Sequence, residues 1–162
     1  MKVIKLSGPM VRAILECRKT QTRSVIDPQP KELPNGNVSY RCRNGCGFEN
    51  FSKLTLLQFC PHGKPGDRIW CSAPSGSRIL IEIIDIRVER VQEITAEDAQ
   101  AEGISVPRCG CEVCAHSSQL CPADASSHIE EYGHRWDHLN AKRGHSWESN
   151  PWVWVISFRR LK

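Results

Sequence analysis

The chain of 162 residues lacks any run of about 18 apolar residues, so we expect no segment to span a bilayer. Its first residues, 1–7, lack a long apolar segment and a small-residue cleavage site. The sequence therefore predicts no secretion signal and a cytoplasmic location. Internal repeats and low-complexity tails are missing as well. A chain of this length fits one domain, 1–162, which can bury a core without covalent staples.

Acidic residues are scarce in the first part of the chain. Residues 1–64 hold eleven Lys or Arg against four Asp or Glu, whereas residues 65–162 hold eleven against fourteen. The formal net charge of +4 is therefore concentrated in the N-terminal part. A basic region of this kind indicates an anionic partner, of which nucleic acid is the most common.

Cysteine, in contrast, is abundant, with nine residues. Reducing conditions argue against disulfides, an odd number cannot pair completely, and clustering indicates metal binding. Four thiols within the segment 105–126 have the spacing of a closed structural zinc site: Cys109, Cys111, Cys114 and Cys121. The alternative is a set of free thiols on a loop.

A second group has a looser spacing: Cys42, Cys46, Cys60 and His62. It could close a further zinc site that joins the Pro- and Gly-rich segment 27–59 to the turn at Gly63. The composition of 27–59 predicts a loop insertion outside the core. Cys17 and Cys71 lie in apolar contexts and are interpreted as small core residues.

The apolar pattern predicts short strands with helices inserted between them, which is an α+β fold around a small twisted sheet or barrel. Within the strand 78–88, Ile79 to Ile83 alternate in one phase and Ile84 to Val88 in the other. Such a change indicates either an inserted bulge residue or a strand buried on both faces. The remaining expected elements are a strand at 3–6, a helix from Gly8, a strand at 68–70, a short helix at 95–103, a helix from Ser127 and a central closing strand at 152–158.

The stretch from Arg18 to Arg23 combines an amine, two hydroxyls and two guanidinium groups in six residues. That mixture suits a site that holds an anion or nucleotide, or one where a hydroxyl attacks a carbonyl. A solvated basic run after a helix is the alternative. If the helix continues, Lys19 and Thr22 share a face, and if it ends at Arg18, tertiary structure must bring them together.

Together with Arg18 to Arg23, the segments 7–11, 60–70, 85–102 and 150–154 resemble the ASCH-domain family of the PUA-like superfamily, and in particular its phage and prophage members. The resemblance runs nearly end to end. It implies a small PUA-like β-barrel with helices packed around it, and a cleft that binds RNA or nucleotides. Here the barrel would carry the Cys-rich insertion.

One bacterial branch of that family is an amidohydrolase that removes acetyl groups from the amine of cytidine. Carried over by motif position, its lysine, threonine and glutamate fall on Lys19, Thr22 and Glu102. Thr22 could supply the nucleophile, while Lys19 acts as a base or holds the oxyanion and Glu102 handles protons. The chain departs from that branch at Ser24, where the branch has an arginine.

Three functions follow from these observations. The first is a nucleic-acid or nucleotide-binding protein, with RNA or a modified nucleoside as partner and a cleft lined by Lys19, Thr22 and Glu102. Arg18 and Arg23 would engage phosphate or ribose, and Trp70 would stack on a base. The second is the amidohydrolase, and the third is a zinc-stapled phage accessory protein that acts through protein contacts. Binding is the favoured hypothesis.

Overall fold

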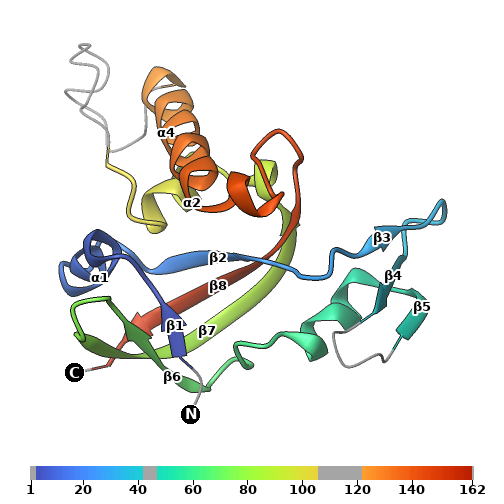
Figure 1. Cartoon of the computed structure of the whole chain (residues 1–162), viewed down its shortest axis with the longest axis horizontal. Helices are drawn as coiled ribbons and strands as arrows, with labels where there is room; N and C mark the ends of the chain where they lie inside the picture. Colours follow the sequence, from blue (N-terminus) through green and yellow to red (C-terminus); the bar gives the residue numbers. More distant parts are fainter. Residues whose placement is uncertain (1–2, 42–46, 106–121, 162) are drawn as a thin grey trace.

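The computed structural model describes residues 3–41, 47–105 and 122–161, which form an α+β fold with two sheets (Figure 1). The larger sheet has five strands in the order β1-β6-β7-β8-β2. Its strands are β1 (Val3–Lys5), β2 (Gln21–Val25), β6 (Arg68–Ser72), β7 (Arg78–Arg90) and β8 (Trp152–Arg160). β1 runs parallel to β6, and the other neighbouring pairs are antiparallel.

The strand β8 lies between β7 and β2, as expected for a segment that is apolar on both faces. Trp154 and Ile156 pack into the larger hydrophobic core inside the curled sheet. Val153 and Val155 point to the opposite face and pack under the helices α2 (Ala96–Ala101) and α4 (Pro122–Asn140). The prediction of a central closing strand is confirmed.

The long strand β7 contains the predicted bulge. In its ladder with β8, Ile83 lies opposite Phe158 and Asp85 lies opposite Ser157, so Ile84 has no partner. Ile84 is 49% exposed, whereas Ile83 and Ile86 are buried. The extra residue explains the change of phase along the strand.

The sheet is not closed into a barrel in the described part of the chain. No ladder joins β1 to β2, which are its two edge strands. The helix α1 (Gly8–Leu15) connects these edges, and its Val11 and Ile14 pack into the same core as the strands (Figure 1). The expected closed barrel is therefore replaced by an open, curled sheet, because β1 pairs with β6 and not with β2.

The segment 27–59 differs from the predicted loop. It contains a second sheet of β3 (Lys31–Glu32), β4 (Val38–Arg41) and β5 (Gly47–Phe51), followed by the 3-10 helix η1 (Lys53–Phe59). Figure 1 shows this sheet at the end of the molecule opposite to α1. Val38 and Tyr40 are buried in the main core, so β-forming residues outweigh the Pro and Gly content around them.

The tryptophan at the start of β8 connects the second sheet to the first. Trp152 is 1% exposed and its ring contacts two cations, with the Arg90 guanidinium carbon 4.3 Å and the Lys53 Nζ 4.6 Å from the ring centroid. Glu32 of β3 accepts a hydrogen bond from Arg90 and pairs with Lys53. This cluster fastens η1 and β3 to β8.

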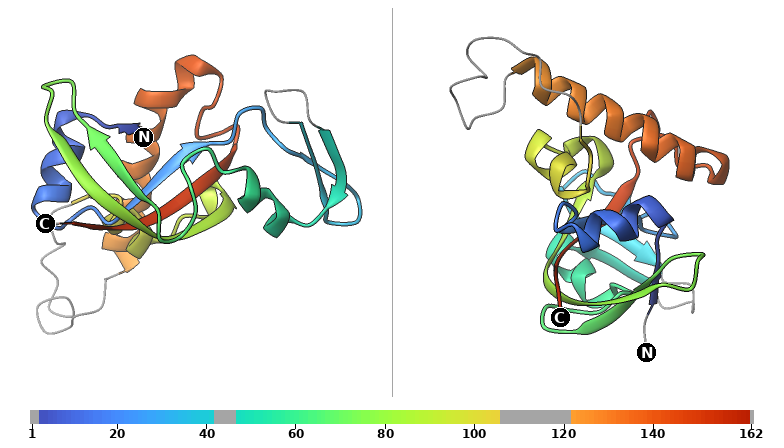
Figure 2. Two further views of the ribbon diagram at one scale, coloured as in Figure 1. Left: turned by 90° about the horizontal axis from the view of Figure 1, so that it is seen from below. Right: turned by 90° about the vertical axis from the view of Figure 1, so that its left-hand side faces the viewer.

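Helices α2 (Ala96–Ala101) and α4 (Pro122–Asn140) lie together on one side of the five-stranded sheet (Figures 1 and 2). Their buried residues include Ala99, Tyr132 and Trp136. Two single-turn 3-10 helices, η2 (Val91–Glu93) and η3 (Ala141–Arg143), flank them. Among the described residues, no helix is both long and apolar enough to cross a membrane.

Candidate functional site

The turn after α1 decides where Lys19 lies. The helix ends at Leu15, Cys17 takes a left-handed conformation with φ 58°, and the N–H groups of Arg18 and Lys19 both donate to the Ala13 carbonyl. Lys19 and Thr22 are therefore not on a continuing helix. Cys17 is exposed, which corrects its interpretation as a core residue, whereas Cys71 is buried as expected.

Lys19 meets Glu102, which is 83 residues away in the sequence, in an isolated antiparallel bridge. Its Nζ donates to the Glu102 Oε2 at 2.5 Å, to the Glu102 carbonyl at 3.0 Å and to the Gln21 carbonyl at 2.8 Å. The two residues are 1% and 5% exposed. Since an ammonium group has three donors, these acceptors use all of them.

Gly103 makes the close approach possible. It has φ +88°, which favours glycine, and it ends the helix α2 as the sequence predicts. A Cβ at this position would lie 3.2 Å from the Ala13 Cβ and 3.3 Å from the Lys19 Cβ. The glycine therefore lets the turn at Glu102 pack directly against α1 and Lys19.

Arg23 connects the same carboxylate to α2. Its side chain is buried, and it donates to Gln21 Oε1 at 2.6 Å, to Asp98 Oδ2 at 2.7 Å and to Glu102 Oε1 at 3.5 Å. Burial alone would lower the pKa of Arg23, but the charges of Glu102, Tyr132 and Asp98 outweigh it and raise the pKa. Its Nε is buried without a hydrogen-bond partner among the described residues.

Thr22 lies on the other face of β2 from Arg23, because side chains alternate along a strand. Thr22, Arg23 and Glu102 nevertheless line one small cavity of about 40 Å³, which Tyr132 and Trp136 also border. Lys19 is not among the described residues that line it. The structure thus brings Lys19, Arg23 and Glu102 into contact and places Thr22 at the cavity, while their functional roles stay predictions.

A larger groove of about 270 Å³ adjoins the small cavity and occupies the gap between β1 and β2. We call it the β1–β2 groove. The two spaces share Met10, Thr22 and Arg23 among their lining residues. The groove is lined by Ile4, Lys5, Leu6, Met10, Thr22, Arg23, Ser24, Val25, Asp27, His62, Leu139, Asn140 and Arg143.

Sequence reasoning missed Lys5, Asn140 and Arg143 as lining residues of this groove. They come from β1, from the end of α4 and from η3, so no local motif contains them. The excess of basic residues in the segment 1–64, which indicated an anionic partner, is the only feature of the sequence that pointed to Lys5.

Two of the predicted binding residues lie elsewhere. Arg18 is exposed and pairs with Glu16. Trp70 is half-buried in β6, opposite Val3 and Leu80. Neither lines the small cavity or the groove in the described structure, and their proposed contacts with phosphate and base are untested.

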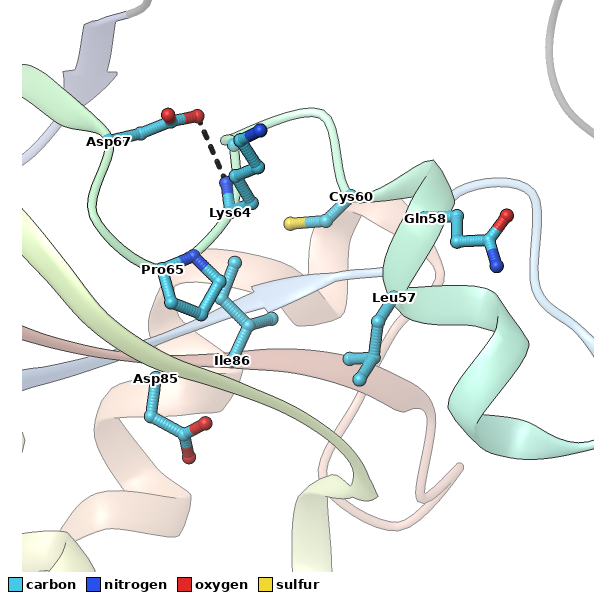
Figure 3. Close-up of a pocket in the computed structure, with 9 residues that line it drawn as sticks. Leu57, Gln58, Cys60, Lys64, Pro65, Asp67, Asp85 and Ile86 are labelled. Atoms are coloured by element: carbon cyan, nitrogen blue, oxygen red, sulfur yellow. Dashed lines mark hydrogen bonds between the residues drawn. The ribbon is translucent and has the colours of Figure 1, made fainter.

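The third cavity, of about 500 Å³, borders the turn that follows His62. Figure 3 shows Leu57, Pro65 and Ile86 around it, with the Cys60 thiol pointing toward it. The turn is tight, because Gly63 and Gly66 both have positive φ and Asp67 accepts from the Lys64 N–H. The lining is mixed, because Lys64, Asp67 and Asp85 border the cavity as well as the apolar side chains.

The predicted zinc ligands lie mostly outside the described residues. This holds for Cys109, Cys111, Cys114 and Cys121, and for Cys42 and Cys46 of the second group. Cys60 is buried and His62 borders the groove. Within the described ranges, no group of three or more His, Cys, Asp or Glu is arranged to hold a metal ion.

Zinc binding therefore stays a prediction. We expect elemental analysis of the purified chain to find at least one zinc per molecule, since clustered thiolates bind this ion tightly at neutral pH. Treatment with a chelator should then lower the thermal midpoint. A preparation without stoichiometric metal, made in zinc-supplemented medium, would contradict the prediction.

Comparisons with known proteins show the fold. No family model and no curated protein sequence matches the chain. The crystal structure of protein EF3133 from Enterococcus faecalis V583, described as family-model DUF984, matches with a TM-score of 0.55 and 12% identity, over 99% of this chain and 76% of that one. An ASCH domain from Lactobacillus crispatus JV V101 is similar with a TM-score of 0.46 and 10% identity, over 98% and 79% of the two chains.

The chain thus shares the fold of the Enterococcus protein. The ASCH-type resemblance that the motifs indicate stays a prediction, since the similarity to the ASCH domain has a TM-score below 0.5. Its phage-type branch is a prediction that these comparisons do not test.

Proposed function

We propose that the chain binds nucleic acid or a nucleotide in the β1–β2 groove and the small cavity beside it. The observation that carries this proposal is a groove of about 270 Å³ that has Lys5 and Arg143, both exposed, among its lining residues. Neither ammonium nor guanidinium group has an ion-pair partner among the described residues. Such groups are available to phosphate oxygens.

Arg23 supports the proposal from the inside of the site. Its side chain is buried, it lines both the groove and the small cavity, and its Nε lacks a partner in the described structure. A buried donor without a partner costs free energy, which an acceptor on a ligand or a bound water would recover. Arg23 thus forms part of the inner wall of the groove, while Lys5 and Arg143 supply exposed cations at its lining.

The same contacts favour binding over turnover. All three donors of Lys19 are used within the protein, so this ammonium is held as a structural partner of Glu102. A cavity of about 40 Å³ holds a water molecule but no nucleoside. For an amidohydrolase, the scissile amide would have to reach Glu102 from the adjoining groove.

One observation keeps the amidohydrolase as a second candidate, because Thr22 and Glu102 line the same cavity. Release of acetate from N-acetylcytidine that disappears in Thr22→Ala would support it. A zinc-stapled accessory protein that works through protein contacts is the third hypothesis. It would be favoured by a defined protein partner together with indifference to nucleic acid.

Binding of a labelled mixed-sequence RNA, measured by fluorescence anisotropy at 50 and 200 mM salt, tests the main proposal. We expect the affinity to fall at least tenfold between these salt concentrations, because phosphate contacts release counterions. Arg143→Ala should weaken binding several-fold and flatten the salt dependence.

The matched control is Lys142→Ala, which removes an exposed cation of η3 that does not line the groove. We expect this variant to bind nearly as well as the unmodified chain. Equal effects of the two changes, or no salt-sensitive binding to RNA or DNA at all, would contradict the proposal.

A further inference from the structure

The edge of β2 that faces the groove carries main-chain groups without partners. The Ile26 N–H donates to the Trp152 carbonyl, and the Thr20 carbonyl accepts from the Phe158 N–H. In this register, the even-numbered residues from 20 to 26 direct their main-chain groups toward β8. Residues opposite one another in an antiparallel ladder alternate between bonded and non-bonded pairs. Arg23 and Val25 therefore direct their N–H and C=O groups away from β8, to the edge that lines the groove.

The facing edge of β1 has the same property. The Leu6 N–H donates to the carbonyl of Ser72, the last residue of β6. Because successive residues of a strand direct their main-chain groups to opposite sides, those of Lys5 point away from β6. Lys5 lines the groove. No hydrogen bond recorded within the described ranges uses the main chain of Lys5, Arg23 or Val25 on this side.

Two strand edges with free donors and acceptors thus both border the groove. Unpaired main-chain groups at a sheet edge bind a partner that supplies complementary groups in one plane. Leu6, Met10 and Leu139 add apolar surface to the walls. Such a slot suits a flat heterocycle that carries hydrogen-bond donors and acceptors on its edge and apolar faces above and below.

The size and charge of the groove distinguish between a flat heterocycle and an extended peptide as its partner. An extended peptide would also pair with strand edges. However, about 270 Å³ lies below the usual range of ligand pockets, which is about 300–1,000 Å³, and therefore fits one small unit and not a chain of several residues. Lys5 and Arg143 at the rim also match a phosphate next to that unit.

We propose that the β1–β2 groove takes up one unpaired nucleobase, which the main chain of Lys5 on one side and of Arg23 and Val25 on the other bind by hydrogen bonds. This inference rests on the proposed function and makes it more specific. The chain would bind single-stranded or extruded nucleotides and would exclude duplex, whose base edges are paired and stacked. Affinity would come from the sheet edges as well as from phosphate.

The substitution Lys5→Pro tests the role of the main chain. Proline removes the N–H that faces the groove but no ladder bond, and it is tolerated on edge strands in this orientation. Lys5→Ala is the matched control, because it removes the charge and keeps the N–H. With a labelled 12-mer single-stranded RNA, we expect Lys5→Pro to bind roughly fivefold more weakly than Lys5→Ala, which is the effect of about one hydrogen bond.

A second pair of variants avoids the strands. Leu139→Trp should fill the groove from α4, where Leu139 is 46% exposed, and reduce binding at least tenfold. His134→Trp adds the same side chain at an exposed position of α4 that does not line the groove, and should leave binding unchanged. Thermal melting of all four variants shows whether each one is folded.

Comparison of the 12-mer with its own duplex separates this inference from the proposed function. Single strand bound at least tenfold more tightly than duplex, with both variant pairs behaving as described, would support base insertion. Equal binding of duplex and single strand, or Leu139→Trp binding as well as His134→Trp, would overturn it and leave nucleic-acid binding in place. Absence of binding to either probe would overturn both.

Discussion

Replacement of Glu102 by alanine is expected to destabilise the fold by about 3–5 kcal/mol, which is the usual cost of breaking a buried ion pair by removing one partner. The reason lies in Lys19. Its ammonium group would stay buried, with the Gln21 and Glu102 carbonyls as acceptors but without the carboxylate at 2.5 Å. Arg23 would lose one of its acceptors in the same step.

Urea unfolding followed by circular dichroism measures this effect. The double variant Lys19→Met with Glu102→Leu serves as the control, because it removes both charges and keeps apolar volume. It should recover most of the lost stability, since replacement of a whole buried pair is often neutral. A loss below about 1 kcal/mol in Glu102→Ala would show that the pair is not buried as described.

Replacement of Trp152 by alanine is expected to have a comparable effect, a loss of about 3–5 kcal/mol, because the ring is fully buried and the cavity cannot collapse completely. The change also removes the surface on which Lys53 and Arg90 lie. Because these cations fasten η1 and β3 to β8, limited proteolysis should cut the segment 27–59 more quickly in this variant.

The variant Trp152→Phe distinguishes the contribution of the buried aromatic surface from that of the indole N–H. The Trp152 Nε1 is buried without a hydrogen-bond partner among the described residues, so its removal sacrifices no bond. We expect Trp152→Phe to cost much less than Trp152→Ala and to retain the protection of 27–59. Similar losses in the two variants would mean that the indole itself, and not the buried aromatic surface, stabilises this region.

Short-range patterns predicted much of the fold. The apolar run in β8 and the change of phase in β7 each follow from side-chain periodicity within one strand, and both features were found. The closed barrel was not found, because closure depends on whether β1 and β2 pair. That pairing is decided by the length of β1 and the position of α1, which no local pattern encodes.

The candidate site divides in the same way. Spacing along the chain could not place Lys19 beside Glu102, because their contact depends on the turn at Cys17 and on the absence of a side chain at Gly103. The family resemblance named both residues, but it carried no information on how many partners the ammonium has. The groove was not predicted, since it exists where two sheet edges fail to meet.

The position of β8 has a consequence for biosynthesis. Within the described sheet, β2 forms its ladder with β8. The strand β2 ends at Val25 and β8 begins at Trp152, so most of the chain separates the two strands in the sequence. A ribosome that adds about 5–20 residues per second reaches β8 roughly ten seconds after it has made β2. During that interval the nascent β2 lacks the strand with which it pairs in the folded sheet, so this part of the sheet forms only after nearly the whole chain has been made.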